Sequence, residues 1–173
     1  MVYNIIEMGD KKKEKLFISN YNQYKNKIYT YFLYRVNFNE ALAEDLTSEA
    51  FLKAYKSWES FDCERSFQSW IYAISHNHLL NHYRTVGREV STEETNDIAT
   101  EFKNNLEASI ELERIITEIY KMDNYCREVL LLRFVDGLEN KEIADLLAKD
   151  ESAVRTQMSR ALASLRDKLN LNL

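Results

Sequence analysis

The strongest structural signal in this chain is the segment Glu142-Ile143-Ala144-Asp145-Leu146-Leu147, followed after a short gap by Val154-Arg155-Thr156-Gln157-Met158-Ser159-Arg160. The pattern predicts two short helices joined by a tight turn. The second of them has one apolar face and one face rich in arginine, serine, threonine and glutamine. These are the features of a helix-turn-helix motif, in which the second helix lies in the major groove of DNA.

The second predicted helix separates its side chains cleanly on a helical wheel. One side carries Val154, Met158, Ala161, Leu165 and Leu169. The other side carries the candidate base-contacting residues Ser152, Arg155, Thr156, Ser159 and Arg160, with Gln157 at its flank. Arginine reads guanine or grips phosphate, and small hydroxyl side chains allow close approach to DNA. Asp150 is a candidate N-cap. A solvated amphipathic helix is the alternative interpretation.

The composition favours a helical globular protein. The 173 residues include 45% hydrophobic and 29% charged residues, no proline, and only the glycines Gly9, Gly87 and Gly137. With so few helix breakers, an all-α fold is expected. No apolar run is long enough to span a membrane, and residues 1–15 do not match a signal peptide. Cys63 and Cys126 fit no metal spacing, which indicates reduced cytosolic thiols.

Charge is unevenly distributed along the chain. The net charge is −5, but residues 87–119 hold nine acidic residues against three basic ones, which leaves the remainder at +1. Residues 155–168 carry four basic residues and one acidic residue. Because local fields govern DNA binding more than the total charge does, an acidic protein with this segregation is compatible with DNA binding.

Apolar periodicity predicts two helical domains. The expected boundaries are a first domain at residues 1–86, an acidic linker at 87–105 and a second domain at 106–173. In the first domain we expect one helix that includes Ile28 and Phe32 and continues through Arg35-Val36. A second helix has the apolar stripe Leu42, Leu46, Ala50, Ala54 and Trp58, and a third runs from Ser66 to Tyr83 after a polar loop at 60–65. Beyond the linker, a helix at 126–135 should end at Gly137 in a left-handed C-cap.

A second motif lies about a hundred residues upstream of the first. It comprises Ala43-Glu44-Asp45-Leu46-Thr47-Ser48-Glu49-Ala50-Phe51-Leu52-Lys53-Ala54-Tyr55, then Phe61-Asp62, Phe67-Gln68-Ser69-Trp70-Ile71, Asn77 and Asn81-His82-Tyr83-Arg84. After the acidic gap follows Arg127-Glu128-Val129-Leu130-Leu131-Leu132-Arg133-Phe134. In this order the chain resembles the extracytoplasmic-function (ECF) class of bacterial sigma factors, which have only regions two and four. The resemblance covers residues 16–169.

The resemblance implies a role for each motif. The residues Asp45, Glu49, Phe51 and Lys53 would dock on the clamp helices of the largest subunit of core RNA polymerase; the pattern alone favours a solvated helix face for Asp45 and Glu49, and the resemblance reverses that preference. Capture of the minus-ten promoter element as single strand would use aromatic stacking and polar base contacts, supplied by Phe67, Trp70, Asn77, Asn81, His82 and Arg84. Trp70 and Phe67 can instead be core aromatics. The helix at 151–169 would read the minus-thirty-five element.

Further expectations follow from the same resemblance. The protein would be a cytoplasmic transcription initiation factor, without a cofactor or covalent chemistry of its own, directing polymerase to alternative promoters in response to envelope or environmental stress. An anti-sigma factor, often membrane-anchored in this class, would hold it inactive. Some residues depart from the family pattern. Ala148 stands where the turn usually has glycine, and Lys149 stands where an apolar residue is usual. Glu139 stands where a Ser or Thr cap is common, although Asn140 could serve as the cap instead, and His76 stands in place of a basic residue.

All three histidines, His76, His78 and His82, fall within seven residues. His78 and His82 are one helical turn apart and could share a metal ion, but no further ligands of zinc-site spacing accompany them. Contact with backbone or phosphate is the favoured interpretation. Two other function classes stay open at this stage: a stand-alone helix-turn-helix regulator, which would bind duplex DNA without polymerase, and a metal-dependent enzyme built on the histidines.

Overall fold

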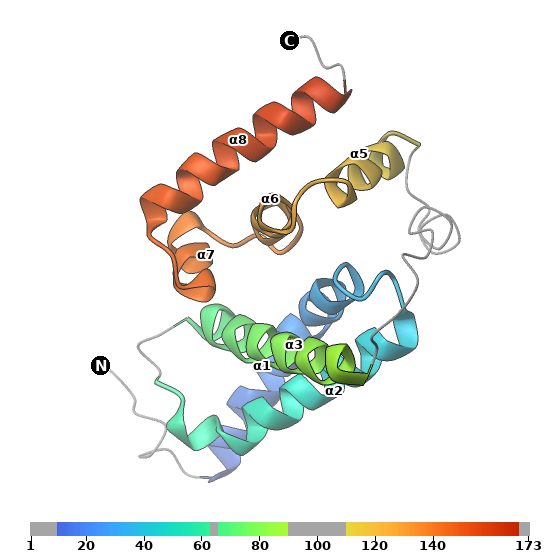
Figure 1. Ribbon diagram of the computed structural model, residues 1–173. Helices are drawn as coiled ribbons and strands as arrows, with labels where there is room; N and C mark the ends of the chain where they lie inside the picture. The colour runs from blue at the N-terminus through green and yellow to red at the C-terminus, as the bar shows by residue number, and fades with distance from the viewer. Residues whose placement is uncertain (1–9, 63–65, 90–109, 170–173) are drawn as a thin grey trace. The chain divides into compact units, whose positions relative to one another are not determined.

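The computed structural model of the chain describes residues 10–62, 66–89 and 110–169 (Figure 1). Within these ranges every regular element is helical, as the composition predicts. Contacts divide the chain into two compact units, Met1–Glu93 and Glu94–Leu173. No helix in the described ranges is long and apolar enough to cross a membrane.

The first unit is built from three long helices, α1 (Asp10–Leu33), α2 (Glu40–Lys56) and α3 (Phe67–Glu89). Each of the three packs against the other two. The core they share includes the fully buried side chains Ile28, Tyr31, Phe32, Phe38, Ile71 and Tyr72. The rings of Tyr31 and Tyr72 meet edge to face with centroids 5.5 Å apart. Burial of each such side chain stabilises the unit by about 1.5–3 kcal/mol.

Helix α1 ends earlier than the sequence predicted. It stops at Leu33, and residues 34–38 form a turn, so the expectation that Arg35-Val36 continue the helix is wrong. The reason is that Asn37 and Phe38 adopt left-handed backbone conformations, with φ of 53° and 59°. Asn39 then N-caps α2, because its side-chain oxygen accepts a hydrogen bond of 3.0 Å from the Leu42 N–H.

Helix α2 also ends before the predicted stripe is complete. Its buried residues include Leu46, Ala50 and Ala54 of the predicted stripe, whereas Trp58 lies in the 3₁₀ turn η2 (Trp58–Ser60). The Ser57 hydroxyl donates to the Lys53 carbonyl at 2.8 Å, which closes the helix. Trp58 remains buried because its ring stacks on Phe61, with centroids 5.2 Å apart. The loop expected to be polar therefore contains a core residue, Phe61.

Helix α3 is longer than predicted and runs to Glu89. It includes the first three residues of the expected linker. The rest of that linker, residues 90–105, lies outside the described residues, as do Cys63 and the helical start expected at residue 106.

The second unit contains α5 (Ile110–Tyr120), α6 (Asn124–Leu130), the π-helical turn η3 (Leu131–Val135), α7 (Asn140–Leu147) and α8 (Glu151–Leu169). The helix expected at residues 126–135 is present, but it changes from α-helical to π-helical at Leu131. The Asp136 N–H accordingly donates to the Leu131 carbonyl, five residues back, at 3.0 Å. The left-handed conformation predicted at Gly137 is confirmed, with φ of +74°.

The turn between α7 and α8 uses an alanine in a conformation that suits glycine. Ala148 has φ 51° and ψ 50°, and the next amide, Lys149 N–H, donates to the Ala144 carbonyl at 2.9 Å. At the other end of α7, Glu139 itself is the N-cap, so Asn140 does not take over that position. The Glu142 carboxylate accepts from the Glu139 N–H at 2.9 Å.

We expect Ala148→Gly to raise the free energy of unfolding of the second unit by about 1 kcal/mol, because glycine adopts the left-handed conformation without the steric cost that Cβ imposes. Denaturant unfolding followed by circular dichroism would measure the change. The matched control is Ala163→Gly, an exposed position within α8, where the same substitution should lower stability by about 1 kcal/mol. A loss of stability in both variants would contradict the argument from the turn.

Candidate functional site

The outer face of α8 presents the polar residues predicted from the sequence. Ser152, Arg155, Thr156, Ser159 and Arg160 are all exposed, while Val154, Met158, Ala161 and Leu169 are buried on the opposite side. The Thr156 and Ser159 hydroxyls donate to carbonyls one turn back, at 2.9 and 3.1 Å, which fixes their rotamers and turns oxygen lone pairs outward. Two arginines and three hydroxyls therefore share one solvent-facing surface.

Gln157 does not lie on that outer surface. Its side chain is half-buried, and its Nε2 donates to the Sγ of Cys126 in α6 at 3.0 Å. Burial, followed by the hydrogen bond with Asp123, raises the pKa of the Cys126 thiol, so the sulfur stays protonated at neutral pH. The structure therefore gives Gln157 a role in holding α8 on α6.

An aromatic cluster stands at the start of α3. Phe67 is buried and contacts Trp58, Phe61 and Trp70, with ring centroids 5.7–6.0 Å apart. Trp70 is half-buried, and its ring lies 4.8 Å from that of Phe61. Phe67 is thus a core aromatic, whereas part of Trp70 is accessible. Phe61 completes the cluster, and its sequence position in a polar loop gave no sign of this.

The exposed face of α3 carries amide and cationic groups. Asn77, Asn81 and Arg84 are exposed and His82 is half-buried. The Arg84 guanidinium donates to the Asn81 Oδ1 at 2.7 Å, and the Thr85 hydroxyl donates to the Asn81 carbonyl at 3.0 Å. The first of these contacts orients the Asn81 amide, so the face has a fixed hydrogen-bonding group beside a positive charge.

Helix α2 presents Asp45, Glu49 and Lys53 to solvent. Phe51, predicted as part of the same face, is only 4% exposed and its ring meets that of Tyr21 at 4.8 Å. The prediction of Phe51 as a surface contact does not fit this burial, because α1 covers its ring. The large apolar side chains that α2 does expose are Leu52 (52%) and Tyr55 (55%); sequence reasoning missed them because their motif contains apolar residues on every side.

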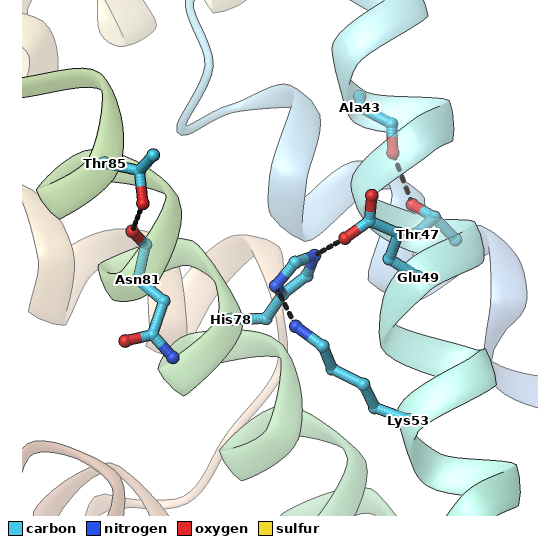
Figure 2. Close-up of polar contacts among 7 residues, drawn as sticks. All are labelled: Ala43, Thr47, Glu49, Lys53, His78, Asn81 and Thr85. Atoms are coloured by element: carbon cyan, nitrogen blue, oxygen red, sulfur yellow. Dashed lines mark hydrogen bonds and ion pairs between the residues drawn. The ribbon is translucent and has the colours of Figure 1, made fainter. Parts of the chain in front are cut away.

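The three histidines point to different partners. His78 is buried and reaches across from α3 to Glu49 and Lys53 of α2 (Figure 2). The Nδ1 of His76 instead lies 3.0 Å from the hydroxyl of Tyr31. Within the described ranges, no three histidine, cysteine, aspartate or glutamate side chains are grouped so as to hold a metal ion.

Comparison with known proteins identifies both units. Sigma-70 region 2 matches residues 21–89 and Sigma-70, region 4 matches residues 112–165. The chain is 30% identical to the ECF RNA polymerase sigma-E factor of Haemophilus influenzae, covering 95% of this chain and 91% of that protein. It is also 30% identical to the ECF RNA polymerase sigma factor SigW of Bacillus subtilis, covering 98% and 97%.

The chain belongs to the ECF sigma factor family. The chain spans only part of the length of some relatives. It is 29% identical to the sigma factor BldN of Streptomyces coelicolor, of which it covers 63%. Membership confirms the resemblance drawn from the ordered motifs and favours a sigma factor over a stand-alone helix-turn-helix regulator.

Solved structures share the fold of this sigma factor. The sigma factor RpoE of Bartonella quintana, solved with the anti-sigma factor NepR, matches with a TM-score of 0.75 and 19% identity, covering 92% of this chain and 99% of that one. CnrH, solved with the cytosolic domain of CnrY, matches with a TM-score of 0.68 and 22% identity, covering 92% and 91%.

We expect the first unit of this sigma factor to lose stability as the pH falls below about 6.5, the ordinary pKa of histidine. Burial, and then the positive charge of Lys53, lower the pKa of His78 despite the opposing effect of Glu49; His82 lowers it further. The unfolded chain therefore binds a proton that the folded chain resists, and stability is lost between the unfolded and the folded pKa.

Denaturant unfolding at pH 7.5 and 5.5 would measure this effect. The wild-type protein should lose more stability between the two pH values than His78→Leu, which has no ionisable group at that position. Equal losses in the two proteins would contradict the assignment to His78.

Proposed function

We propose that this sigma factor reads two promoter elements with separate faces, the exposed side of α8 for the minus-thirty-five element and the exposed side of α3 for the minus-ten element. The observation that carries the proposal is the outer face of α8, where arginines and hydroxyls stand opposite a buried apolar stripe. This is the arrangement by which a recognition helix enters the major groove.

On α8 the proposed contacts are Ser152, Arg155, Thr156, Ser159 and Arg160. Arg155 lies 3.6 Å from Glu151. Because both side chains are exposed, Arg155 can exchange this partner for a DNA phosphate or a guanine edge at little cost. Arg160 is exposed one turn and a residue further along. We assign Gln157 to the packing of α8 instead of to DNA, on the basis of its contact with Cys126.

On α3 the proposed contacts with the melted minus-ten strand are Asn77, Asn81, His82 and Arg84, with the accessible part of Trp70 as a stacking surface. Phe67 supports the Trp70 ring from within the core. Asn81 is the best candidate for reading an extruded base, because Arg84 fixes its amide in place.

On α2 we propose that Asp45, Glu49 and Lys53 meet the clamp helices of core RNA polymerase, together with the exposed Leu52 and Tyr55. Exposed apolar side chains combined with charged ones on one helix are a composition suited to a specific protein interface. Phe51 supports this surface from below through its contact with Tyr21.

We also propose that an anti-sigma factor regulates the protein, since solved relatives of the same fold were captured with NepR and with the cytosolic domain of CnrY. A membrane-anchored inhibitor would link this sigma factor to envelope or environmental stress. By the same family argument the protein acts in the cytoplasm and performs no covalent chemistry itself.

In vitro transcription with core polymerase tests the function as a whole. Fragmented bacterial genomic DNA would be transcribed with and without the protein, and the start sites mapped. The addition of the protein should produce discrete new starts that share two spaced upstream elements. If no new starts appear and the protein alone shifts duplex DNA in a gel, the stand-alone regulator is favoured instead.

At such a promoter, Arg160→Ala should lower initiation by about fivefold to 150-fold, since a lost bidentate base contact costs about 1–3 kcal/mol. The matched control is Arg166→Ala, which removes an exposed arginine from the last turn of the same helix, far from its N-terminal half. Run-off transcription at fixed salt would compare them. Equal losses from both variants would indicate a general electrostatic effect and contradict base reading by Arg160.

A further inference from the structure

The buried side chain of His78 lies between two charged residues of α2. Its Nδ1 is 2.5 Å from the Nζ of Lys53, and its Nε2 is 3.1 Å from a carboxylate oxygen of Glu49. Figure 2 shows the imidazole extending from α3 toward α2 with one of these side chains on either side. Glu49 and Lys53 are one helical turn apart and both reach solvent, while His78 does not.

The chemistry of the contact determines the form of the ring. A lysine ammonium has three donors and no acceptor, so the Nδ1 facing it must accept. The ring proton then resides on Nε2, which lies 3.1 Å from the Glu49 carboxylate as a close charge–dipole contact, without the angle of a hydrogen bond. A neutral imidazole of this tautomer therefore accepts from the cation and places its polar N–H edge near the anion, which no aliphatic side chain can do.

We propose that His78 is a positioning residue for the polymerase-docking face of α2. It restricts the rotamers of Glu49 and Lys53 from below, so that their charged ends are already oriented when the partner arrives. Long exposed side chains otherwise lose conformational freedom on binding, which weakens association. This inference rests on the proposed docking role of α2.

Two conservative variants separate the two arms of the contact. The Oδ1 of asparagine is bonded to Cγ, as Nδ1 is in histidine, so His78→Asn keeps an acceptor toward Lys53 and loses the donor toward Glu49. The Nε2 of glutamine lies one bond further out, so His78→Gln keeps the donor and loses the acceptor. His78→Leu removes both. Leu79→Ala, which truncates the buried neighbour in α3, serves as the control for a general loss of stability.

The experiment is equilibrium binding of the fluorescently labelled full chain to core RNA polymerase at fixed salt and pH 7.5, with unfolding curves for every variant. We expect His78→Leu to weaken binding about fivefold and Leu79→Ala to bind as the wild type does. Glu49→Ala should weaken binding by a larger factor in the wild type and in the His78→Gln protein than in the His78→Asn background, where Glu49 is no longer positioned by the ring.

The outcomes distinguish this inference from the proposed function. If the wild type binds polymerase and the folded histidine variants bind equally well, the positioning role is overturned and the docking function stands. If Glu49→Ala weakens binding by the same factor in every background, the positioning role is also overturned. If the wild type does not bind core polymerase, both are overturned. Should His78→Leu not fold, the asparagine and glutamine variants decide the question.

Discussion

A helix can bury only one stripe of its surface, and in this small helical protein the choice of stripe determines everything that is left for partners. Helix α8 buries Val154, Met158 and Ala161, and so its arginines and hydroxyls have no place except solvent. Helix α3 buries Ile71, Tyr72 and Leu79 in the same way and leaves its amides outside. The apolar contacts that stabilise each unit thus also orient its candidate DNA-binding groups.

The same constraint explains why a buried polar residue has an unusual influence here. A charged group in the interface between α2 and α3 would be costly to desolvate, and His78 avoids that cost by remaining neutral with a donor on one side and an anion on the other. Its partners extend outward to the surface of α2. The interface is therefore a place where core packing and an exposed charged face are directly connected.

Periodicity was sufficient to predict the helices and the outer face of α8, because both depend on spacing within one segment. The left-handed turn at Gly137 was predictable from the residue type, because glycine adopts this conformation without steric cost. The predictions that failed concern side chains whose surroundings come from other segments. Phe51 is covered by α1, Gln157 is held by a sulfur atom of α6, and Phe61 is buried against Trp58. The early end of α1 reflects left-handed backbone at Asn37 and Phe38, residues whose types do not require it.

Helices α2 and α3 share one core. The face proposed for polymerase and the face proposed for the minus-ten strand are therefore supported by the same buried side chains. A large substitution in that core, at Phe32 or Tyr72 for example, would disturb both faces together and could not assign a role to either. Exposed positions such as Asp45 and Asn77 separate them, because each can be changed without loss of buried area. His78 is informative for a different reason: it is buried, yet its two polar contacts lie only on the α2 side, so isosteric changes there act on one face before the other.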